Sequence, residues 1–401
     1  FNQLADKYYR PDINLNKVSS HLTTMDALFR FLEYTSLFIQ SGRADYTTIS
    51  FRKIAKEKIN LLLNEYEFVF NENWDSLSFF DVFGDPYTYP LPWDLEDKLY
   101  RITLSDLKEI KDRVNRHDIE EDNKFLVEIE NLLNKLKQNK DDTEKLHRIS
   151  DKVRDLTVSV NEDIYINITS KKDEKRLEIL EKFSDIIEEK STETSLALWF
   201  ENVTWKSLIA LNGTHFVKRN FKIEPDLSPR FFAPGMGNTP DVELYNNDFI
   251  IIAEVSLTTG TQQWKAEGGS VVDHINSFLK VKIGNNGEQK GNVVKGDKRE
   301  LIGLFIAKSI NNRIMWLFHA LNNNSWLNQA IPIIPLKLED YLKIIKKLYT
   351  DDIKAIYFEK FLWTLHREAK ACDTVDEWQK SIAKRLNNFI DEPNTYINFN
   401  F

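Results

Sequence analysis

The sequence predicts an α/β protein: a mixed sheet flanked by helices in the C-terminal half, with a mainly helical region before it. Three patterns indicate this. From residue 191 to 401, apolar β-branched runs alternate with segments of helical spacing. Residues 101–190 are charged and helical in spacing throughout, whereas residues 1–100 combine helical segments with a strand–turn–strand pattern.

Within the C-terminal region, the predicted order is α, β, β, β, α, β, α, β, followed by three helices. The helix after the third strand is expected over 270–282. The predicted strands are the β-branched, apolar runs at 215–223, 241–245, 248–257, 300–308 and 330–336. This order indicates a mixed sheet with helices on both faces.

The region 101–190 predicts long amphipathic helices over 105–116, 124–138 and 144–164, with many Glu/Lys pairs. Its plain interpretation is a helical linker between two working domains.

The region 1–100 is interpreted as a winged-helix-like DNA-binding subdomain. Thr24 is placed to cap a helix, "SLFIQ" and "YTTISF" flank the turn "SGRAD", and an amphipathic helix follows over 52–68. A helix followed by a two-stranded hairpin builds a winged-helix reader of DNA, but many other α+β proteins share this arrangement. The proline-rich loop 83–95 is a candidate boundary.

Composition restricts the chemistry. With 42% hydrophobic and 29% charged residues, the 401-residue chain is typical of a globular protein of two or three domains. No apolar run reaches the roughly 18 residues that span a bilayer, so a membrane is not expected as a partner. The single cysteine, Cys372, excludes a disulfide framework and a cysteine-based zinc site, and it fits the cytoplasm. The net charge of −8 argues mildly against nucleic acid, although acidic helices can coexist with a basic groove.

Two carboxylates are brought together by the hairpin predicted over 241–256. Asp241 follows Pro240, a turn can form at 246–248, and Glu254 lies deep in the apolar return strand. In such an antiparallel pair, residue 241 lies roughly opposite 253–254. Carboxylates this close repel each other, and a divalent cation is the simplest compensation. Oxygen ligands without cysteine indicate Mg²⁺, with Mn²⁺ as a substitute.

The same stretch, "PDVELYNNDFIIIAEVS", resembles the PD-(D/E)xK nuclease signature. Asp241 and Glu254 take its acidic positions, and the resemblance implies that the Val255 carbonyl joins them as a metal ligand. The lysine that ends the signature, and normally orients or activates the attacking water, is replaced by Ser256. The candidates to replace this lysine are Gln262 and Lys265.

A longer stretch, "EVSLTTGTQQWKAEGGSVVDHI", is similar to type IIS restriction and nicking endonucleases of the AlwI family. The resemblance covers about 190–340 well and the earlier regions loosely. Members carry an Asp, a Glu-Val-(Thr/Ser)-Leu strand, a Gly-Gln-containing turn, a second Glu, a His on the next helix, and a Glu beside a Trp on the leading helix. The matching residues are Asp241, Glu254, Gln262, Glu267, His274, Glu201 and Trp205.

The resemblance implies a Mg²⁺-dependent enzyme that cuts double-stranded DNA outside a short asymmetric site. Glu267 and His274 would position water or assist proton transfer, and Glu201 would complete the site. Family members carry a further recognition subdomain upstream, which fits a chain that begins with Phe1. Nicking by a monomer and double-strand cutting through a homodimer or a second subunit both remain open.

Several of these residues also have a structural interpretation. Glu201 lies in an almost wholly apolar segment, His274 shares a helix face with core residues, and Glu267 could favour a helix start. The Lys-rich loop 280–300 either meets phosphates or is merely solvated. Its candidate DNA-binding residues are Lys290, Lys295, Lys298 and Arg299.

Two other functions remain open. A nuclease fold that no longer cuts and serves in binding or regulation fits the absent lysine. A helix-rich interaction protein fits the net acidity and the long charged helices.

Overall fold

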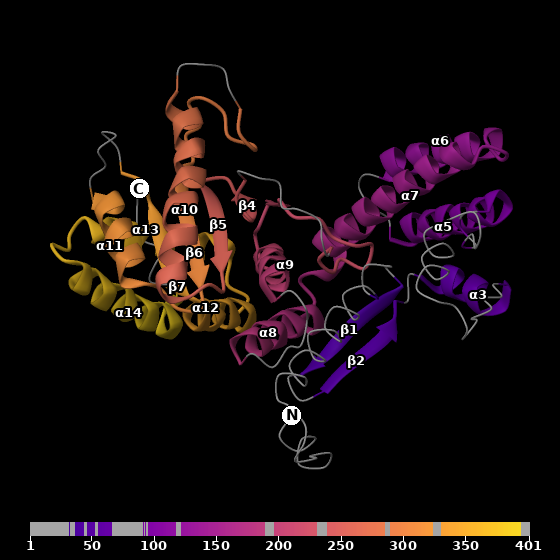
Figure 1. The fold of residues 1–401 in the computed structure, drawn as a ribbon. Coiled ribbons are helices and arrows are strands. Elements are labelled where there is room, and N and C mark those ends of the chain that lie inside the picture. Colours follow the sequence, from indigo (N-terminus) through magenta and orange to yellow (C-terminus); the bar gives the residue numbers. More distant parts are fainter. Residues whose placement is uncertain are drawn as a thin grey trace, which may run out of the picture. The chain divides into compact units, whose positions relative to one another are not determined.

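The computed structural model describes residues 32, 37–43, 46–52, 55–65, 91, 93, 95–117, 122–188, 196–230, 239–284, 289–323 and 330–393. The chain forms two compact units, whose elements are drawn in Figure 1. Unit 1 extends to Ile168 and also includes Ile223–Ser228, while unit 2 comprises Thr169–Lys222 and the chain from Pro229 onward. Among the described residues, no helix has the length and apolar character needed to cross a membrane.

Unit 1 contains the predicted hairpin. Strands β1 (Phe38–Arg43) and β2 (Tyr46–Phe51) pair antiparallel, and they are followed by helix α3 (Lys56–Glu65). Alternating β-branched and aromatic residues explain the strands. The hairpin and the helix after it are therefore confirmed. The predicted cap at Thr24 and most of the proline-rich loop 83–95 lie outside the described residues.

Three long helices of unit 1 share one hydrophobic core: α5 (Glu96–His117), α6 (Asp122–Gln138) and α7 (Thr143–Ile164). Each helix buries a stripe of residues at helical spacing, as its sequence predicts. Helix α7 continues into a short π-helical turn, η3 (Tyr165–Thr169).

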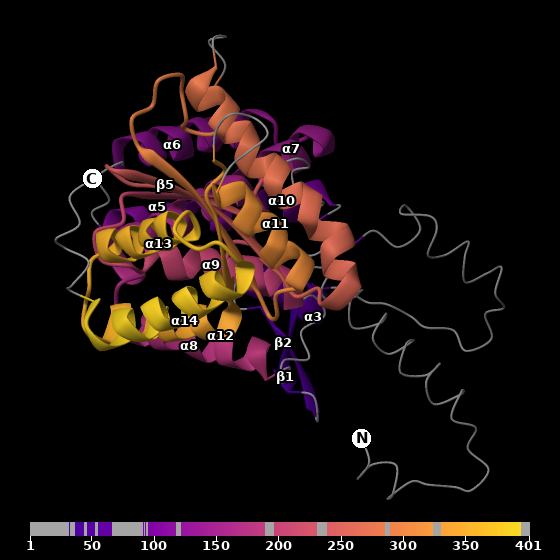
Figure 2. The same ribbon diagram turned by 90° about the vertical axis from the view of Figure 1, so that its left-hand side faces the viewer.

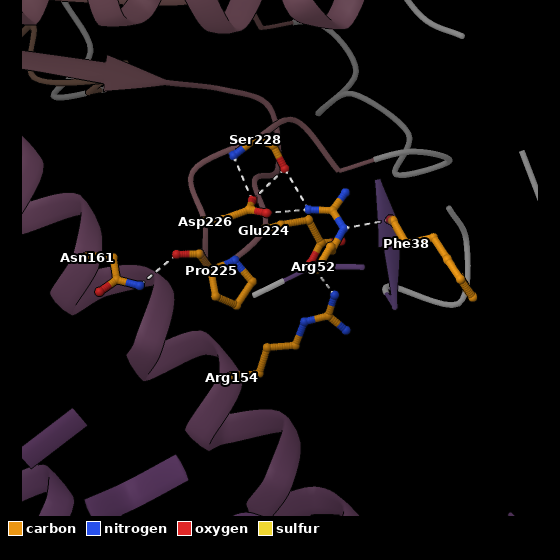
Figure 3. Close-up of polar contacts among 8 residues, drawn as sticks. All are labelled: Phe38, Arg52, Arg154, Asn161, Glu224, Pro225, Asp226 and Ser228. Atoms are coloured by element: carbon orange, nitrogen blue, oxygen red, sulfur yellow. Dashed lines mark hydrogen bonds and ion pairs between the residues drawn. The ribbon is translucent and has the colours of Figure 1, made fainter. Parts of the chain in front are cut away.

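A short excursion of the chain, residues 223–228, belongs to unit 1 although the chain on both sides belongs to unit 2. We call it the clasp segment. Arg52 Nη1 donates to Asp226 Oδ2 at 2.6 Å and to Ser228 Oγ at 2.9 Å (Figure 3). Its Nε donates to the Phe38 carbonyl of β1 at 3.0 Å. One buried guanidinium therefore ties the clasp segment to the hairpin.

Helix α7 holds the other side of the clasp segment. Arg154 pairs with the buried carboxylate of Glu224, and Asn161 Nδ2 donates to the Pro225 carbonyl at 2.6 Å (Figure 3). Leu227 has a positive φ of 62° and donates its N–H to the Glu224 carbonyl, which closes a tight turn. These contacts join parts of unit 1 that lie far apart along the chain.

Unit 2 is built on the five-stranded mixed sheet that the sequence predicts. The strands are β3 (Phe216–Arg219), β4 (Val242–Tyr245), β5 (Phe249–Ser256), β6 (Glu300–Ala307) and β7 (Ile333–Lys337). They lie side by side in that order; the pairs β3–β4 and β4–β5 are antiparallel, and β5–β6 and β6–β7 are parallel. The apolar run of β5 is buried at the centre of this sheet, which explains its lack of alternation.

The helices of unit 2 are α8 (Asp173–Ile187), α9 (Leu196–Ile209), α10 (Gly260–Ile283), α11 (Asn312–Asn323), α12 (Leu338–Thr350), α13 (Ala355–Ala369) and α14 (Val375–Asp391). Helices α9 to α13 contact the strands and cover both faces of the sheet. On one face Phe305 of β6 packs edge-on against Phe318 of α11, 5.6 Å between ring centroids. On the other, Phe249 of β5 meets Trp363 of α13 at 6.3 Å. Figure 2 shows α10 running beside α11.

Helix α10 begins at Gly260, ten residues before the predicted start at 270. Gly260 and Gln262, which carry the resemblance to a Gly-Gln-containing turn, lie in the first turn of this helix. The helix was predicted to start at residue 270 because Gly268 and Gly269 disfavour a helix interior. A Cβ at Gly268 would lie 3.0 Å from a ring carbon of Trp264, so this glycine permits close packing within the helix.

Candidate active site

The register of the β4–β5 hairpin brings Asp241 beside the end of β5. Val242 pairs with Ala253, so Asp241, which directly precedes β4, lies opposite the next residues of β5. Asp241 Oδ2 accepts a hydrogen bond from the Val255 backbone N–H at 2.8 Å. Glu254 is 7% exposed. The proximity of the two acids, predicted from hairpin geometry, is thus seen in the fold.

Four carboxylates act on one another around this point. Burial raises the pKa of Asp241 well above its ordinary value, and the charges of Glu254 and Glu267 raise it further. Burial also raises the pKa of Glu254, reinforced by Glu267 and Glu201. The pKa of Glu201 on α9 rises to about 8 through burial and the charge of Asp241. Such crowding of like charges is typical of sites that bind a cation or transfer protons.

His274 on α10 contacts the acid at the centre of this group. Its Nδ1 lies 2.6 Å from Glu254 Oε1. Burial lowers the pKa of the imidazole, and the positive charge of Lys290 lowers it further. A neutral ring that donates from Nδ1 satisfies this geometry and fixes the orientation of the carboxylate. His274 is therefore part of the acidic site, although core residues share its helix face.

Ser256, which stands where the signature has lysine, holds the second glutamate. Its Oγ donates to Glu267 Oε1 at 3.0 Å and accepts from the Thr258 backbone N–H at 3.1 Å. Glu267 lies in the middle of α10, so its predicted alternative role at a helix start is wrong. Helix α10 thus supplies both His274 and Glu267 to the site.

The comparison with known proteins places these residues in a family. A family model described as AlwI restriction endonuclease matches residues 7–344. The chain belongs to the AlwI restriction endonuclease family. The predicted family is confirmed, and with it the coarser prediction of a site-specific DNA endonuclease.

A solved structure similar to this AlwI-family endonuclease is the small subunit (R.BspD6I2) of the heterodimeric restriction endonuclease R.BspD6I. The two are 22% identical, with a TM-score of 0.41, and the match covers 52% of this chain and 98% of that one. Among curated proteins, none matches this chain.

In this AlwI-family chain, both residues predicted to replace the missing lysine are exposed to solvent. Gln262 and Lys265 lie exposed on α10, and neither contacts the acids in the described part of the chain. The adjacent Gln263 is fully buried instead, where its Nε2 donates to the Ser309 carbonyl at 2.7 Å and its Oε1 accepts from the Asn311 N–H at 2.8 Å. The side chain of Gln263 therefore connects α10 to the start of α11.

The four cations predicted to bind DNA have different surroundings in this endonuclease. Lys295 and Lys298 are exposed. Arg299 pairs with Asp297 at 2.6 Å and donates to the Asn292 carbonyl at 3.0 Å, which gives it a role within the loop. Lys290 is half-buried, and its charge acts on Glu254. Contact of these residues with DNA stays a prediction.

Sequence reasoning overlooked Glu243 on β4. This residue is 1% exposed, and its Oε1 accepts from Asn220 Nδ2 at 2.7 Å and from Lys218 Nζ at 3.0 Å. Its Oε2 accepts from the Tyr245 hydroxyl. Strand alternation could have identified it, because residues two apart on a strand share one face and Glu243 lies two after Asp241.

Proposed function

We propose that this AlwI-family endonuclease hydrolyses phosphodiester bonds of double-stranded DNA with Mg²⁺ held by Asp241, Glu254 and the Val255 carbonyl. The supporting observation is the 2.8 Å hydrogen bond from the Val255 N–H to Asp241. It holds one carboxylate beside the other, in a place where burial and like charge raise the pKa of each. A cation that binds both would relieve this repulsion.

The donor set suits Mg²⁺. Every proposed ligand atom is an oxygen, which this hard cation prefers. Among the described residues, no group of three His, Cys, Asp or Glu side chains forms a ready-made metal site. Two carboxylates are nevertheless typical for Mg²⁺, which keeps several water molecules and binds substrate phosphate. When bound, the ion would polarise the phosphoryl oxygen and lower the pKa of a bound water. Mn²⁺ has similar ligand preferences.

The side chains around the metal ligands have separate roles in this proposal. His274 orients Glu254 through their 2.6 Å contact. Glu267, held by Ser256, lies where it can position water or accept its proton. Glu201, with its pKa raised to about 8, can retain a proton near neutral pH and release it above that pH.

The finer features of the activity follow from the resemblance stated above. We propose a type IIS enzyme, in which unit 1 and its β1–β2 hairpin contribute winged-helix-like DNA binding and the cut lies at a fixed distance from a short asymmetric site. The exposed Lys295 and Lys298 would contact phosphates. A single site cuts one strand, so a homodimer or a second subunit would be needed for double-strand cleavage. The proposed compartment is the cytoplasm.

One alternative retains support. Because Ser256 replaces the signature lysine, the fold could bind DNA without cutting it. The interaction-protein alternative has no comparable support now that the family is known.

Cleavage of supercoiled plasmid with Mg²⁺, with Mn²⁺ and with EDTA tests the proposal. Metal-dependent nicking or linearisation at discrete sites supports it. Salt-sensitive DNA retention without cuts would favour the inactive binder instead. Cutting that persists at full rate in EDTA would reject the metal assignment.

A further inference from the structure

We propose that Lys290 supplies the catalytic positive charge that the PD-(D/E)xK signature places at the position of Ser256. Its ammonium would contact the scissile phosphate beside Glu254 and stabilise the negative charge that develops there. This inference rests on the proposed nuclease function and extends it to a residue that lies outside the signature.

Lys290 is held on the helix that supplies the other site residues. Its Nζ donates to Ser277 Oγ, and it lies 5.2 Å from the ring centroid of Phe278. The same Ser277 hydroxyl donates to the His274 carbonyl at 2.5 Å. The ammonium is therefore attached one helical turn after His274, which contacts Glu254.

The charge of Lys290 acts on two buried acids of the sheet, Glu243 and Glu254. Burial lowers its pKa, while the carboxylates of Glu243 and Glu254 act in the opposite direction. The same ammonium lowers the pKa of Glu254, whereas burial raises it. It also lowers the pKa of His274, and there burial acts in the same direction. A half-buried cation within electrostatic reach of a metal-binding carboxylate is well placed to meet the phosphate that the metal binds.

The loop that carries Lys290 is seated on the sheet. Lys290 and Val293 exchange backbone hydrogen bonds at 3.2 and 3.0 Å, and the side chain of Val293 is fully buried. The Asn292 N–H donates to the Tyr245 hydroxyl at 3.0 Å. This anchoring limits the positions available to the ammonium.

Gly291 makes this seating possible. Its φ is +55°, and a Cβ added there would lie 2.2 Å from both Glu243 Oε2 and the Tyr245 hydroxyl. Only glycine combines that backbone conformation with so close an approach. The residue next to Lys290 is thus fitted against the buried acid of β4.

Three other described lysines, each considered above for the site or for DNA, lack this arrangement. Lys265 lies exposed on α10, and Lys295 and Lys298 lie exposed in the same loop. Ser256 occupies the signature position but binds Glu267. Lys290 alone among these four lysines is half-buried and acts on Glu254.

The test compares Lys290→Met, Lys290→Arg and the control Lys346→Met, at an exposed position of α12, in single-turnover cleavage with saturating Mg²⁺. We expect Lys290→Met to slow cleavage by about 10²–10³-fold, the range seen when one charge-stabilising group is lost. DNA affinity and Tm should stay close to wild type, Lys290→Arg should recover at least about a tenth of the rate, and Lys346→Met should change neither the rate nor the affinity. Recovery by arginine distinguishes a charge role from a packing role.

Several results would overturn the inference. They are a wild-type cleavage rate in Lys290→Met, a loss confined to DNA affinity, and equal slowing by Lys346→Met. Asp241→Asn, measured in parallel, separates the two proposals. If Asp241→Asn abolishes cutting and Lys290→Met does not, only the lysine assignment fails. If Asp241→Asn still cuts, or the wild type does not, the proposed function fails, and the lysine role fails with it.

Discussion

Acidic side chains gather in both units, but their charges are compensated in different ways. In the clasp segment each acid has a guanidinium of its own. Asp226 pairs with Arg52 at 2.6 Å, and the arginine side chain is only 2% exposed. Glu224 pairs with Arg154 in the same manner. Both positive charges are supplied by the same chain, so each acid of the clasp segment is neutralised within the fold.

In unit 2 the acids gather without such arginines. Asp241 has a backbone N–H, and Glu254 has the ring of His274. Their pKa values are raised by burial and by one another, which means that folding the metal-free protein costs free energy at neutral pH. The acids of the clasp segment thus have guanidinium partners, whereas the acids of the candidate active site have the arrangement that the proposed metal site requires.

The largest expected effect comes from neutralising the active-site acids. Asp241→Asn or Glu254→Gln should lower plasmid cleavage by about 10³-fold or more, because a proposed metal ligand is lost. In EDTA the Tm should rise, since a repulsive buried charge is removed. Asp226→Asn is the matched control: it should lower the Tm by leaving Arg52 without its carboxylate. A lower Tm for both Asp→Asn variants would contradict the distinction between the two regions.

Removing the Arg52 guanidinium, which binds the clasp segment, should lower the free energy of unfolding. Arg52→Ala leaves Asp226 unpaired and removes donors from Ser228 and Phe38, so we expect a loss of about 2–4 kcal/mol in urea unfolding. Arg148→Ala breaks an exposed pair with Glu144 and should change stability by less than about 0.5 kcal/mol. Equal effects of the two changes would show that the clasp contacts contribute little.

The raised pKa values of the acids in unit 2 also predict that the Tm depends on pH. Consider a carboxyl whose pKa is raised by folding. When the pH lies between its ordinary pKa and its raised pKa, the group is protonated in the folded state and ionised in the unfolded state. For Glu201 this window runs from 4.5 to about 8. The Tm of the metal-free protein should therefore fall as pH rises through this range, and Mg²⁺ should reduce the fall. Glu201→Gln should flatten the profile; an unchanged profile would argue against the raised pKa.

The smallest expected effect concerns Ser256. Ser256→Ala removes one hydrogen bond from Glu267, worth about 1 kcal/mol, so cleavage should slow roughly fivefold. Ser270→Ala is the control on α10, because that hydroxyl donates only to backbone carbonyls of its own helix. Identical rates for wild type and Ser256→Ala would show that the hydroxyl does not position Glu267.

The sequence by itself determined the order of helices and strands along unit 2 and the meeting of Asp241 with Glu254. Both depend on local rules: strands alternate with a period of two residues, and a tight turn sets which residues face each other. The helices of unit 1 followed equally from their apolar spacing. Motif spacing then indicated the family, which the match over residues 7–344 shows.

Tertiary structure alone decided the rest. Nothing local predicts that the clasp segment joins unit 1, that Glu243 is bound by Lys218 and Asn220, or that the charge of Lys290 acts on Glu254. Each of these interactions joins residues from separate elements, and it depends on how helices and loops pack on the sheet. Tertiary packing between separate elements outweighs local propensity, and it cannot be predicted from the spacing of residues along the chain.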